Sequence, residues 1–191
     1  MEKELKFILS RKKTEKYLGS ADFKCELIQY YFDNTDQILN LMQIKVPGDL
    51  KRVTVRIRQQ SIGKDGRFFF TVKAALNDPS ERYEHEFEIN EKQYKMLIEK
   101  YTNHKIEKTR YYFDVEIQAY PAELSIDLFH YLAGQKTEWE WALIEVEYEN
   151  DKVKEALRSG HHELAIINEA CEVTNNKNYL NVELAQKLPS Q

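Results

Sequence analysis

The chain repeats the period-two alternation of a β-strand through most of its length. Apolar and polar residues alternate in segments near 2–9, 25–33, 40–46, 52–60, 67–75, 82–89, 107–117, 123–130 and 141–149. Residues two apart on a strand point to the same side, so each segment has an apolar face and a polar face. Turn-forming residues near 47–49, 63–66, 77–80 and 120–121 connect these segments. Strands that follow one another through short connections favour an antiparallel sheet closed, or nearly closed, on itself.

Three other segments have the residue spacing of helices, at 10–18, 91–103 and 151–170, the last with an interruption at Ser159-Gly160. Asn90 and Gln93 form the pair expected of a capping box at the start of the second helix. No linker or repeat divides the 191 residues, which predicts one domain over 1–191. The predicted fold is α+β and mainly β, a barrel with its helices packed outside.

The polar positions of these strands are charged, and each strand tends to carry one sign. Two carboxylates on one side of a strand lie roughly 6.6 Å apart and can converge on one hard cation. Arginines at the same spacing can each direct a guanidinium fork toward phosphate oxygens. The residues that share a face in this way are Glu2, Glu4 and Lys6; Arg56 and Arg58; Thr71 and Lys73; Glu84, Glu86 and Glu88; Lys108 and Arg110; Ser125 and Asp127; and Glu145 and Glu147.

Any single pair of this kind is most often the solvated face of an amphipathic sheet. The whole set does not fit that reading, since a face that only needs solubility mixes the signs of its charges. In the alternative geometry the apolar faces lie under helices and the charged faces line a hollow centre. Buried charges need water or compensating ions. The pattern therefore predicts a site for a metal-bound oligophosphate.

Composition excludes several other classes of protein. Lys and Arg number 28 against 32 Asp and Glu, a formal net charge of −4, so no global basic field attracts nucleic acid. Cys25 and Cys171 are the only cysteines, which excludes a disulfide framework and a cysteine-rich zinc site. No apolar run approaches 18 residues, so we expect no membrane span. We expect a soluble cytoplasmic protein, and the sequence leaves a homodimer open.

The motifs resemble, nearly end to end, those of the CYTH superfamily, also called the triphosphate tunnel metalloenzymes, in its short bacterial form. The resemblance implies a closed eight-stranded antiparallel tunnel that binds a triphosphate with Mg²⁺ or Mn²⁺. In chain order the motifs are Glu2-Lys3-Glu4-Leu5-Lys6, Gln29-Tyr30-Tyr31-Phe32-Asp33 with Asp36, Arg56-Ile57-Arg58, Thr71-Val72-Lys73, Glu84 to Glu88, Lys108-Thr109-Arg110, Ile126-Asp127-Leu128-Phe129, Glu145-Val146-Glu147 and Glu172-Val173-Thr174, followed by Tyr179 and Asn181 to Leu184.

On this resemblance we expect metal-dependent hydrolysis of a triphosphate, either inorganic or carrying a small organic group. The expected metal ligands are Glu2, Glu4, Asp127, Glu145 and Glu147. The expected phosphate-binding residues are Lys6, Arg56, Arg58, Lys73, Lys108 and Arg110. The expected catalytic residues are Glu4, Lys6 and Glu86.

Other functions share the same metal and phosphate residues. A class IV adenylate cyclase has this fold and converts ATP to cyclic AMP and pyrophosphate. A non-catalytic module would bind polyphosphate without turnover. Thiamine triphosphate is a further candidate substrate, because Trp139 or Trp141 could stack on its rings, although packing is the commoner role of such residues.

Overall fold

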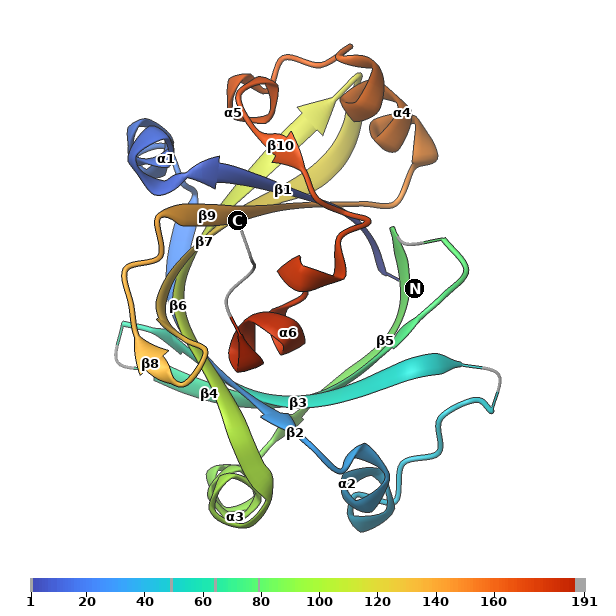
Figure 1. The fold of residues 1–191 in the computed structure, drawn as a ribbon. Coiled ribbons are helices and arrows are strands. Elements are labelled where there is room, and N and C mark those ends of the chain that lie inside the picture. The colour runs from blue at the N-terminus through green and yellow to red at the C-terminus, as the bar shows by residue number, and fades with distance from the viewer. Residues whose placement is uncertain (1, 49, 64, 79, 188–191) are drawn as a thin grey trace.

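Eight strands close into an antiparallel barrel in the computed structural model, which describes residues 2–48, 50–63, 65–78 and 80–187 (Figure 1). Their order around the ring is β1-β5-β4-β3-β2-β6-β7-β9, and this confirms the predicted fold. Asp49, Lys64 and Pro79, which belong to predicted turns, lie outside the described residues. The strands are β1 (Glu2–Ser10), β2 (Phe23–Phe32), β3 (Lys51–Ile62), β4 (Asp65–Ala75), β5 (Glu81–Ile89), β6 (Thr102–Ile117), β7 (Tyr120–Leu132) and β9 (Trp141–Tyr148).

The ring closes at β9, which pairs with β1 on one side and with β7 on the other. Leu5 lies opposite Val146, and Ile126 lies opposite Ile144. On the far side of β1 the pairing with β5 is short, at Glu2 with Arg82 and at Lys3 with Glu81. In this closed ring, every strand is paired on both edges over at least part of its length.

Helices cover the outside of the barrel on two sides, as predicted. The helices are α1 (Arg11–Leu18), α2 (Thr35–Leu41), α3 (Glu91–Tyr101), α4 (Asp151–Ser159) and α5 (Ala165–Asn168). Beneath α4 and α5, Val153 packs with Leu5 and Ile144. Beneath α2 and α3, Leu97 packs with Ile57. These buried clusters hold the apolar faces of the strands, so the opposite faces point inward.

Two details of the helices agree with the sequence. Asn90 and Gln93 exchange reciprocal hydrogen bonds of 2.9 and 3.1 Å at the start of α3, which is the predicted capping box. The predicted interruption after Ser159 is the end of α4, where Gly160 has a φ of 74°. That conformation favours glycine because it has no Cβ.

The strand predicted over 40–46 is wrong. Helix α2 runs to Leu41, and the following residues form turns and an irregular connection to β3. The Asn34 side chain accepts a hydrogen bond of 3.0 Å from the Gln37 N–H and caps α2. Ile38, Leu39 and Met42 pack on the outer face of the barrel. Both edges of β2 are already paired, with β3 and β6, so no edge remains there for another strand.

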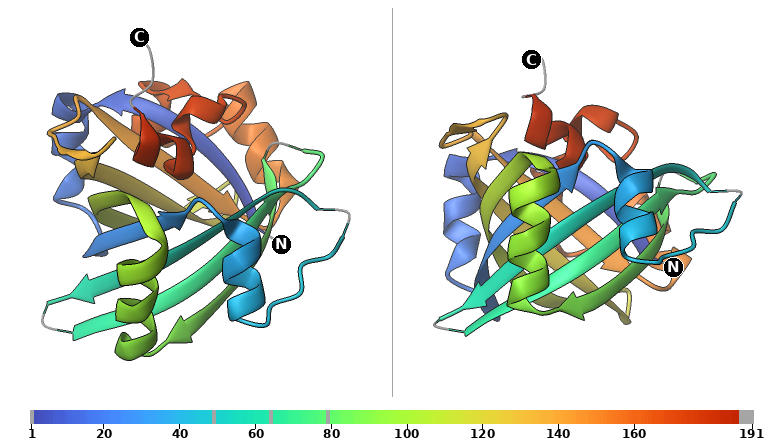
Figure 2. Two further views of the ribbon diagram at one scale, coloured as in Figure 1. Left: turned by 60° about the horizontal axis from the view of Figure 1, so that its bottom comes forward. Right: turned by 90° about the horizontal axis from the view of Figure 1, so that it is seen from below.

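The C-terminal helix α6 (Asn181–Gln186) differs from the other helices because it lies at one end of the barrel, inside the outline of the ring (Figures 1 and 2). Leu184 and Ala185 are buried against Tyr31, Ile106 and Phe129. The segment that leads to α6 contains β10 (Cys171–Glu172), which pairs with β1, and the 3-10 turn η1 (Lys177–Tyr179); a further short strand, β8 (Gln135–Lys136), extends from β7. One end of the barrel is thus partly filled by an apolar cluster.

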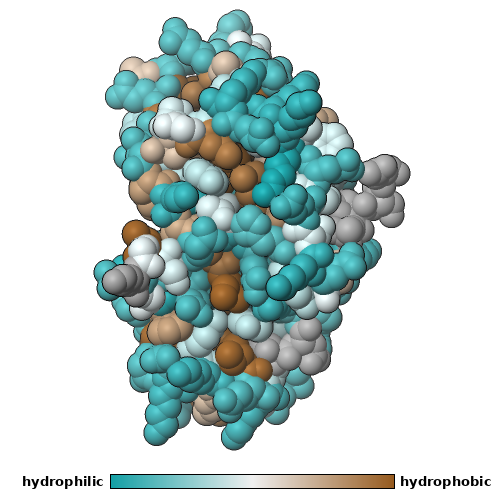
Figure 3. Space-filling view, turned by 90° about the vertical axis from the view of Figure 1, so that its left-hand side faces the viewer, coloured by the Kyte–Doolittle hydropathy of each residue, from teal (hydrophilic) through white to brown (hydrophobic). Residues whose placement is uncertain are grey.

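The outer surface is polar on the side that Figure 3 shows, with apolar residues in small separate groups. Within the described ranges, no helix has the length and apolar character needed to cross a bilayer.

Candidate active site

The charged faces of the strands point into the barrel, where they line a cavity of about 1010 Å³. Alternation explains the placement: Leu5 is buried in the outer core, while Glu4 and Lys6 on either side of it face the cavity. The predicted site residues that line this cavity are Glu2, Glu4, Lys6, Arg56, Arg58, Lys73, Glu86, Arg110, Glu145 and Glu147.

Strand register places several of these charges opposite a partner of the other sign. Lys6 lies opposite Glu145, Lys73 opposite Glu84, and Arg110 opposite Asp127. Glu4, however, lies opposite Glu147. On its other side Glu147 lies opposite Glu123 of β7, which also lines the cavity. Like charges in directly opposed positions destabilise a sheet, so Glu4 and Glu147 need a compensating cation.

Glu2 joins this pair to form a cluster of three carboxylates. One oxygen from each of Glu2, Glu4 and Glu147 lies within 4.8 Å of the others. Carboxylate oxygens are the ligands that Mg²⁺ and Mn²⁺ prefer, so the donor set fits either ion. Lys73 contacts both Glu2 oxygens at 2.7 Å, and the Arg82 Nε donates to Glu4 at 2.8 Å. Among the described residues, Glu147 has no hydrogen-bond or ion-pair partner.

Burial raises the pKa of Glu147 to about 7, and the charges of Glu2 and Glu145 add to this effect. The ordinary value is 4.5. In the metal-free protein this carboxyl therefore holds a proton over a pH range in which the unfolded chain has lost it.

The raised pKa predicts how the stability of the metal-free protein depends on pH. The contribution of Glu147 is fully present below pH 4.5 and is lost as the pH rises toward 7. We expect the free energy of unfolding to fall by roughly 3 kcal/mol or less from this group, measured by urea denaturation in EDTA between pH 5 and 8. Glu147→Gln should remove this part of the slope. Identical slopes in the two proteins would contradict the assignment.

Arg56 and Arg58 form the cationic wall opposite the carboxylate cluster. The Arg58 Nη2 donates to Glu86 at 2.7 Å, and the Arg56 Nη2 lies 3.8 Å from both Glu84 and Glu86. The Nε atoms of both arginines are buried and have no hydrogen-bond partner within the part of the chain that the structure describes. Buried donors of this kind are costly unless a ligand satisfies them, and an anion in the cavity would do so.

Glu86 lies on β5, and its side chain reaches across β4 toward these arginines on β3. Its carboxylate accepts a hydrogen bond of 2.6 Å from the Thr71 hydroxyl as well as the one from Arg58. Glu88, at the next inward position of β5, is half exposed and pairs with Arg67 at 2.6 Å. Of the three glutamates that the sequence placed on one face, Glu84 and Glu86 therefore belong to the cavity and Glu88 does not.

A second set of buried charges lies on the β1, β6, β7 and β9 side. Asp127 accepts two bonds of 2.7 Å from the guanidinium of Arg110, and Lys108 donates to the same carboxylate. Glu145 accepts from both Lys6 and Arg110. Lys108 and Asp127 are fully buried behind Arg110 and do not line the cavity. The structure thus brings Lys6, Arg110 and Glu145 to the site and leaves Lys108 and Asp127 beneath it.

These surroundings shift the pKa values of the buried cations in opposite directions. Burial lowers the pKa of Lys108 to about 8, and the charge of Arg110 adds to the effect. Burial acts on Lys6 too, but Glu145 and Glu4 outweigh it and hold the Lys6 pKa above its ordinary value. Lys6 is therefore a fixed positive charge in the site.

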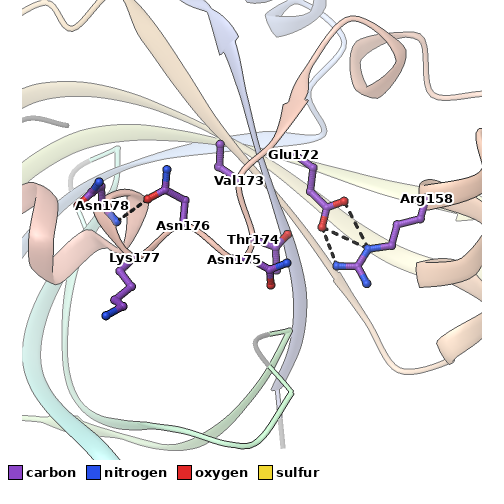
Figure 4. A pocket seen from close by; sticks show the side chains of 8 residues that line it. All are labelled: Arg158, Glu172, Val173, Thr174, Asn175, Asn176, Lys177 and Asn178. Atoms are coloured by element: carbon purple, nitrogen blue, oxygen red, sulfur yellow. Dashed lines mark hydrogen bonds and ion pairs between the residues drawn. The ribbon is translucent and has the colours of Figure 1, made fainter. Parts of the chain in front are cut away.

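The sequence missed two parts of the cavity wall. Arg82 contacts Glu4 and shares a strand face with Glu84, so the period-two pattern could have found it. The C-terminal segment has no such signal. Thr174 accepts a bond of 3.0 Å from the Lys6 N–H, and the segment beyond it lines the same cavity. Figure 4 shows how this segment crosses in front of the strands, beside the Arg158–Glu172 ion pair.

The two tryptophans have the packing role. Trp139 is buried in the cluster at the α6 end of the barrel, 5.5 Å from the ring of Phe129 and 6.3 Å from that of Tyr179. Trp141 packs against the same cluster. Neither lines the cavity, so neither offers a ring to an organic group there.

The strands thus form a closed barrel with a charged interior, in which a cluster of carboxylates and a pair of arginines line one cavity. The sequence matches the family model of the CYTH domain over residues 1–187, and the chain therefore belongs to the CYTH family. No curated protein matches it.

Solved structures support the same fold. The inorganic triphosphatase NE1496 is 22% identical, with a TM-score of 0.52, over 100% of this chain and 97% of its own. PH1819 from Pyrococcus horikoshii OT3 is 23% identical, with a TM-score of 0.58, over 88% and 89%. A Bacillus halodurans protein, bh2851, provisionally named an adenylate cyclase, is 19% identical, with a TM-score of 0.59, over 93% and 95%. Identities this low show a shared fold.

Proposed function

We propose that this protein hydrolyses a triphosphate with the help of a divalent cation. The observation that carries the proposal is the opposed pair of Glu4 and Glu147, with Glu2 beside them, in one cavity with Arg56 and Arg58. A metal ion would compensate the carboxylates, and a polyphosphate would satisfy the guanidinium groups. Each ligand thus supplies the charge that one wall of the cavity lacks.

We assign the metal to Glu2, Glu4 and Glu147. When bound, Mg²⁺ or Mn²⁺ neutralises negative charge on the phosphate oxygens and on the leaving group. Asp127 and Glu145 have a different role in this proposal, because Asp127 does not line the cavity and neither residue belongs to the cluster of Glu2, Glu4 and Glu147. They hold Lys6 and Arg110 in place for the phosphate.

The side chains of this site act through position and charge, as phosphoryl transfer requires. Arg56, Arg58, Lys73 and Arg110 bind and orient the phosphate chain. Glu86, held by Arg58 and Thr71, orients the attacking water by accepting a hydrogen bond from it. We place the reaction in the cytoplasm, where the unpaired Cys25 and Cys171 stay reduced.

Product analysis tests this proposal against its rivals. Purified protein is incubated with inorganic triphosphate, thiamine triphosphate or ATP, each with Mg²⁺ or Mn²⁺. Release of orthophosphate supports hydrolysis. Cyclic AMP with pyrophosphate would make the protein a cyclase. Tight binding of inorganic triphosphate without turnover under either metal would make it a non-catalytic module.

Arg56→Ala should weaken substrate binding more than the chemical step. Its guanidinium belongs to the cationic wall, and its buried Nε has no partner in the described ranges. A charged hydrogen bond of this kind is worth about 1.5–3 kcal/mol. We expect KM for inorganic triphosphate to rise by roughly tenfold or more, measured by steady-state kinetics at saturating metal. Arg67→Ala is the matched control, since Arg67 is exposed at the surface. An unchanged KM in Arg56→Ala would contradict the phosphate-binding role.

A further inference from the structure

Two cations that line the cavity differ from all the others. Six of the lining cations have a carboxylate within ion-pair distance, namely Lys6, Arg56, Arg58, Lys73, Arg82 and Arg110. Arg52 and Lys177 also line the cavity, but neither has a carboxylate partner among the described residues. Both are exposed, so they lie where the cavity meets solvent.

Arg52 is held in an unusual backbone conformation. Its φ is 51°, and the pairing of β3 with β4 shifts register between Lys51 and Thr54. A left-handed conformation costs a non-glycine residue on the order of 1 kcal/mol. Bulges of this kind redirect a side chain at the end of a strand. Here the bulge coincides with a cation that lines the cavity and has no carboxylate partner in the ranges that the structure describes.

Lys177 comes from the other part of the cavity wall, the C-terminal segment. The Val173 N–H donates to the Lys6 carbonyl at 2.8 Å, and Thr174 binds the Lys6 N–H. Beyond Lys177, α6 is fixed by the burial of Leu184. The turn that carries Lys177 is therefore anchored on both sides. In Figure 4 its side chain extends away from the Arg158–Glu172 pair into the opening of the barrel.

The cavity offers little to an aromatic organic group. Tyr31 and Tyr112 are the aromatic residues among its lining side chains, and each is less than 10% exposed. Tyr112 is moreover stacked on Phe23, with ring centroids 4.4 Å apart. The heterocycle of a bound triphosphate ester would extend toward solvent and meet Arg52 and Lys177 there. Among the described lining residues it would meet no open aromatic face.

We propose that Arg52 and Lys177 form a cationic clamp at the mouth of the cavity that selects an outer group with negative charge. The clamp makes inorganic triphosphate, whose terminal phosphates are both free, the preferred substrate over triphosphate esters. An ester with a neutral base gains no attraction there, and the positively charged thiazolium of thiamine triphosphate is repelled. This inference rests on the proposed binding of triphosphates in the same cavity.

The test compares selectivity between substrates in the Arg52→Gln/Lys177→Gln double variant and in the wild-type protein. We measure kcat/KM for inorganic triphosphate, ATP and thiamine triphosphate, and Kd for inorganic triphosphate and ATP by calorimetry with Ca²⁺. In the variant, the preference for inorganic triphosphate should fall about tenfold in both readouts. Arg67→Gln/Lys95→Gln, which removes the same charge from the outer surface, should keep the wild-type preference.

The outcomes separate the clamp from the proposed function. A wild-type protein that prefers an ester, or a double variant that keeps the wild-type preference, would overturn the clamp while leaving hydrolysis intact. Selective binding that the variant loses, in a protein without turnover, would support the clamp and overturn hydrolysis. A wild-type protein that neither binds nor hydrolyses any of the three would overturn both.

Discussion

Glu147→Gln should abolish metal-dependent turnover and, at the same time, stabilise the fold. The substitution removes a metal ligand, and we expect kcat/KM for inorganic triphosphate to fall by at least about 100-fold. It also removes a partly buried carboxylate that lies opposite Glu4 and has no partner of its own among the described residues. The melting temperature of the metal-free protein at pH 8 should therefore rise. Activity assays with Mg²⁺ and calorimetry in EDTA measure the two effects.

In Glu147→Gln, activity should fall while stability rises. Damage to the fold would lower both, so it could not produce this result. Glu4→Gln should lose turnover as well, but without the gain in stability, because Glu4 already binds Arg82 and Lys6. Glu88→Gln, on the same barrel but half exposed, is the control and should keep wild-type activity. Full turnover in Glu147→Gln would contradict the assignment of Glu147 as a metal ligand.

Asp127→Asn should give the largest loss of stability of any substitution considered for this site. Asp127 is fully buried and carries the charge that balances Arg110 and Lys108. Removing one partner from a buried ion pair costs about 3–5 kcal/mol, because the remaining charges are left without compensation. Urea denaturation in EDTA measures this loss directly. Asp114→Asn, at an exposed position farther along β6, is the matched control.

The same variant separates two roles for Asp127. A metal ligand would leave the metal-free protein unchanged or stabilised when neutralised, as expected for Glu147. A residue that holds Arg110 would lose stability without metal and would weaken the binding of inorganic triphosphate. Wild-type stability of Asp127→Asn in EDTA would contradict the second role.

The direction of the charged side chains could be predicted from the sequence, because it follows from the alternation of a strand alone. Arg56 and Arg58 face inward since Ile57 between them belongs to the outer core. The depth of each side chain could not be predicted. Asp127 and Glu145 have the same pattern in the sequence, yet Asp127 lies beneath Arg110 and Glu145 lines the cavity. How deeply a side chain is buried depends on which side chains of neighbouring strands lie over it. The local sequence pattern does not contain this information.

Elements whose position depends on distant parts of the chain could not be predicted from the sequence either. The residues near 40–46 alternate as a strand would, but the edges of β2 were already taken by β3 and β6. The position of α6 depends on an apolar surface that exists only after Tyr31, Ile106 and Phe129 come together. The mouth cation Lys177 is placed by that same packing.

The pairing of β1 has a consequence for how the protein is made. The Lys6 backbone binds Thr174, which follows it by 168 residues, and most of the other partners of β1 are in β9. Contacts between residues so far apart are slow to form, because a long loop must close before they do. During translation, β1 leaves the ribosome before the other strands, and most of it must stay unpaired until β9 has followed. Its alternating glutamates and lysines keep this exposed edge from joining other nascent chains.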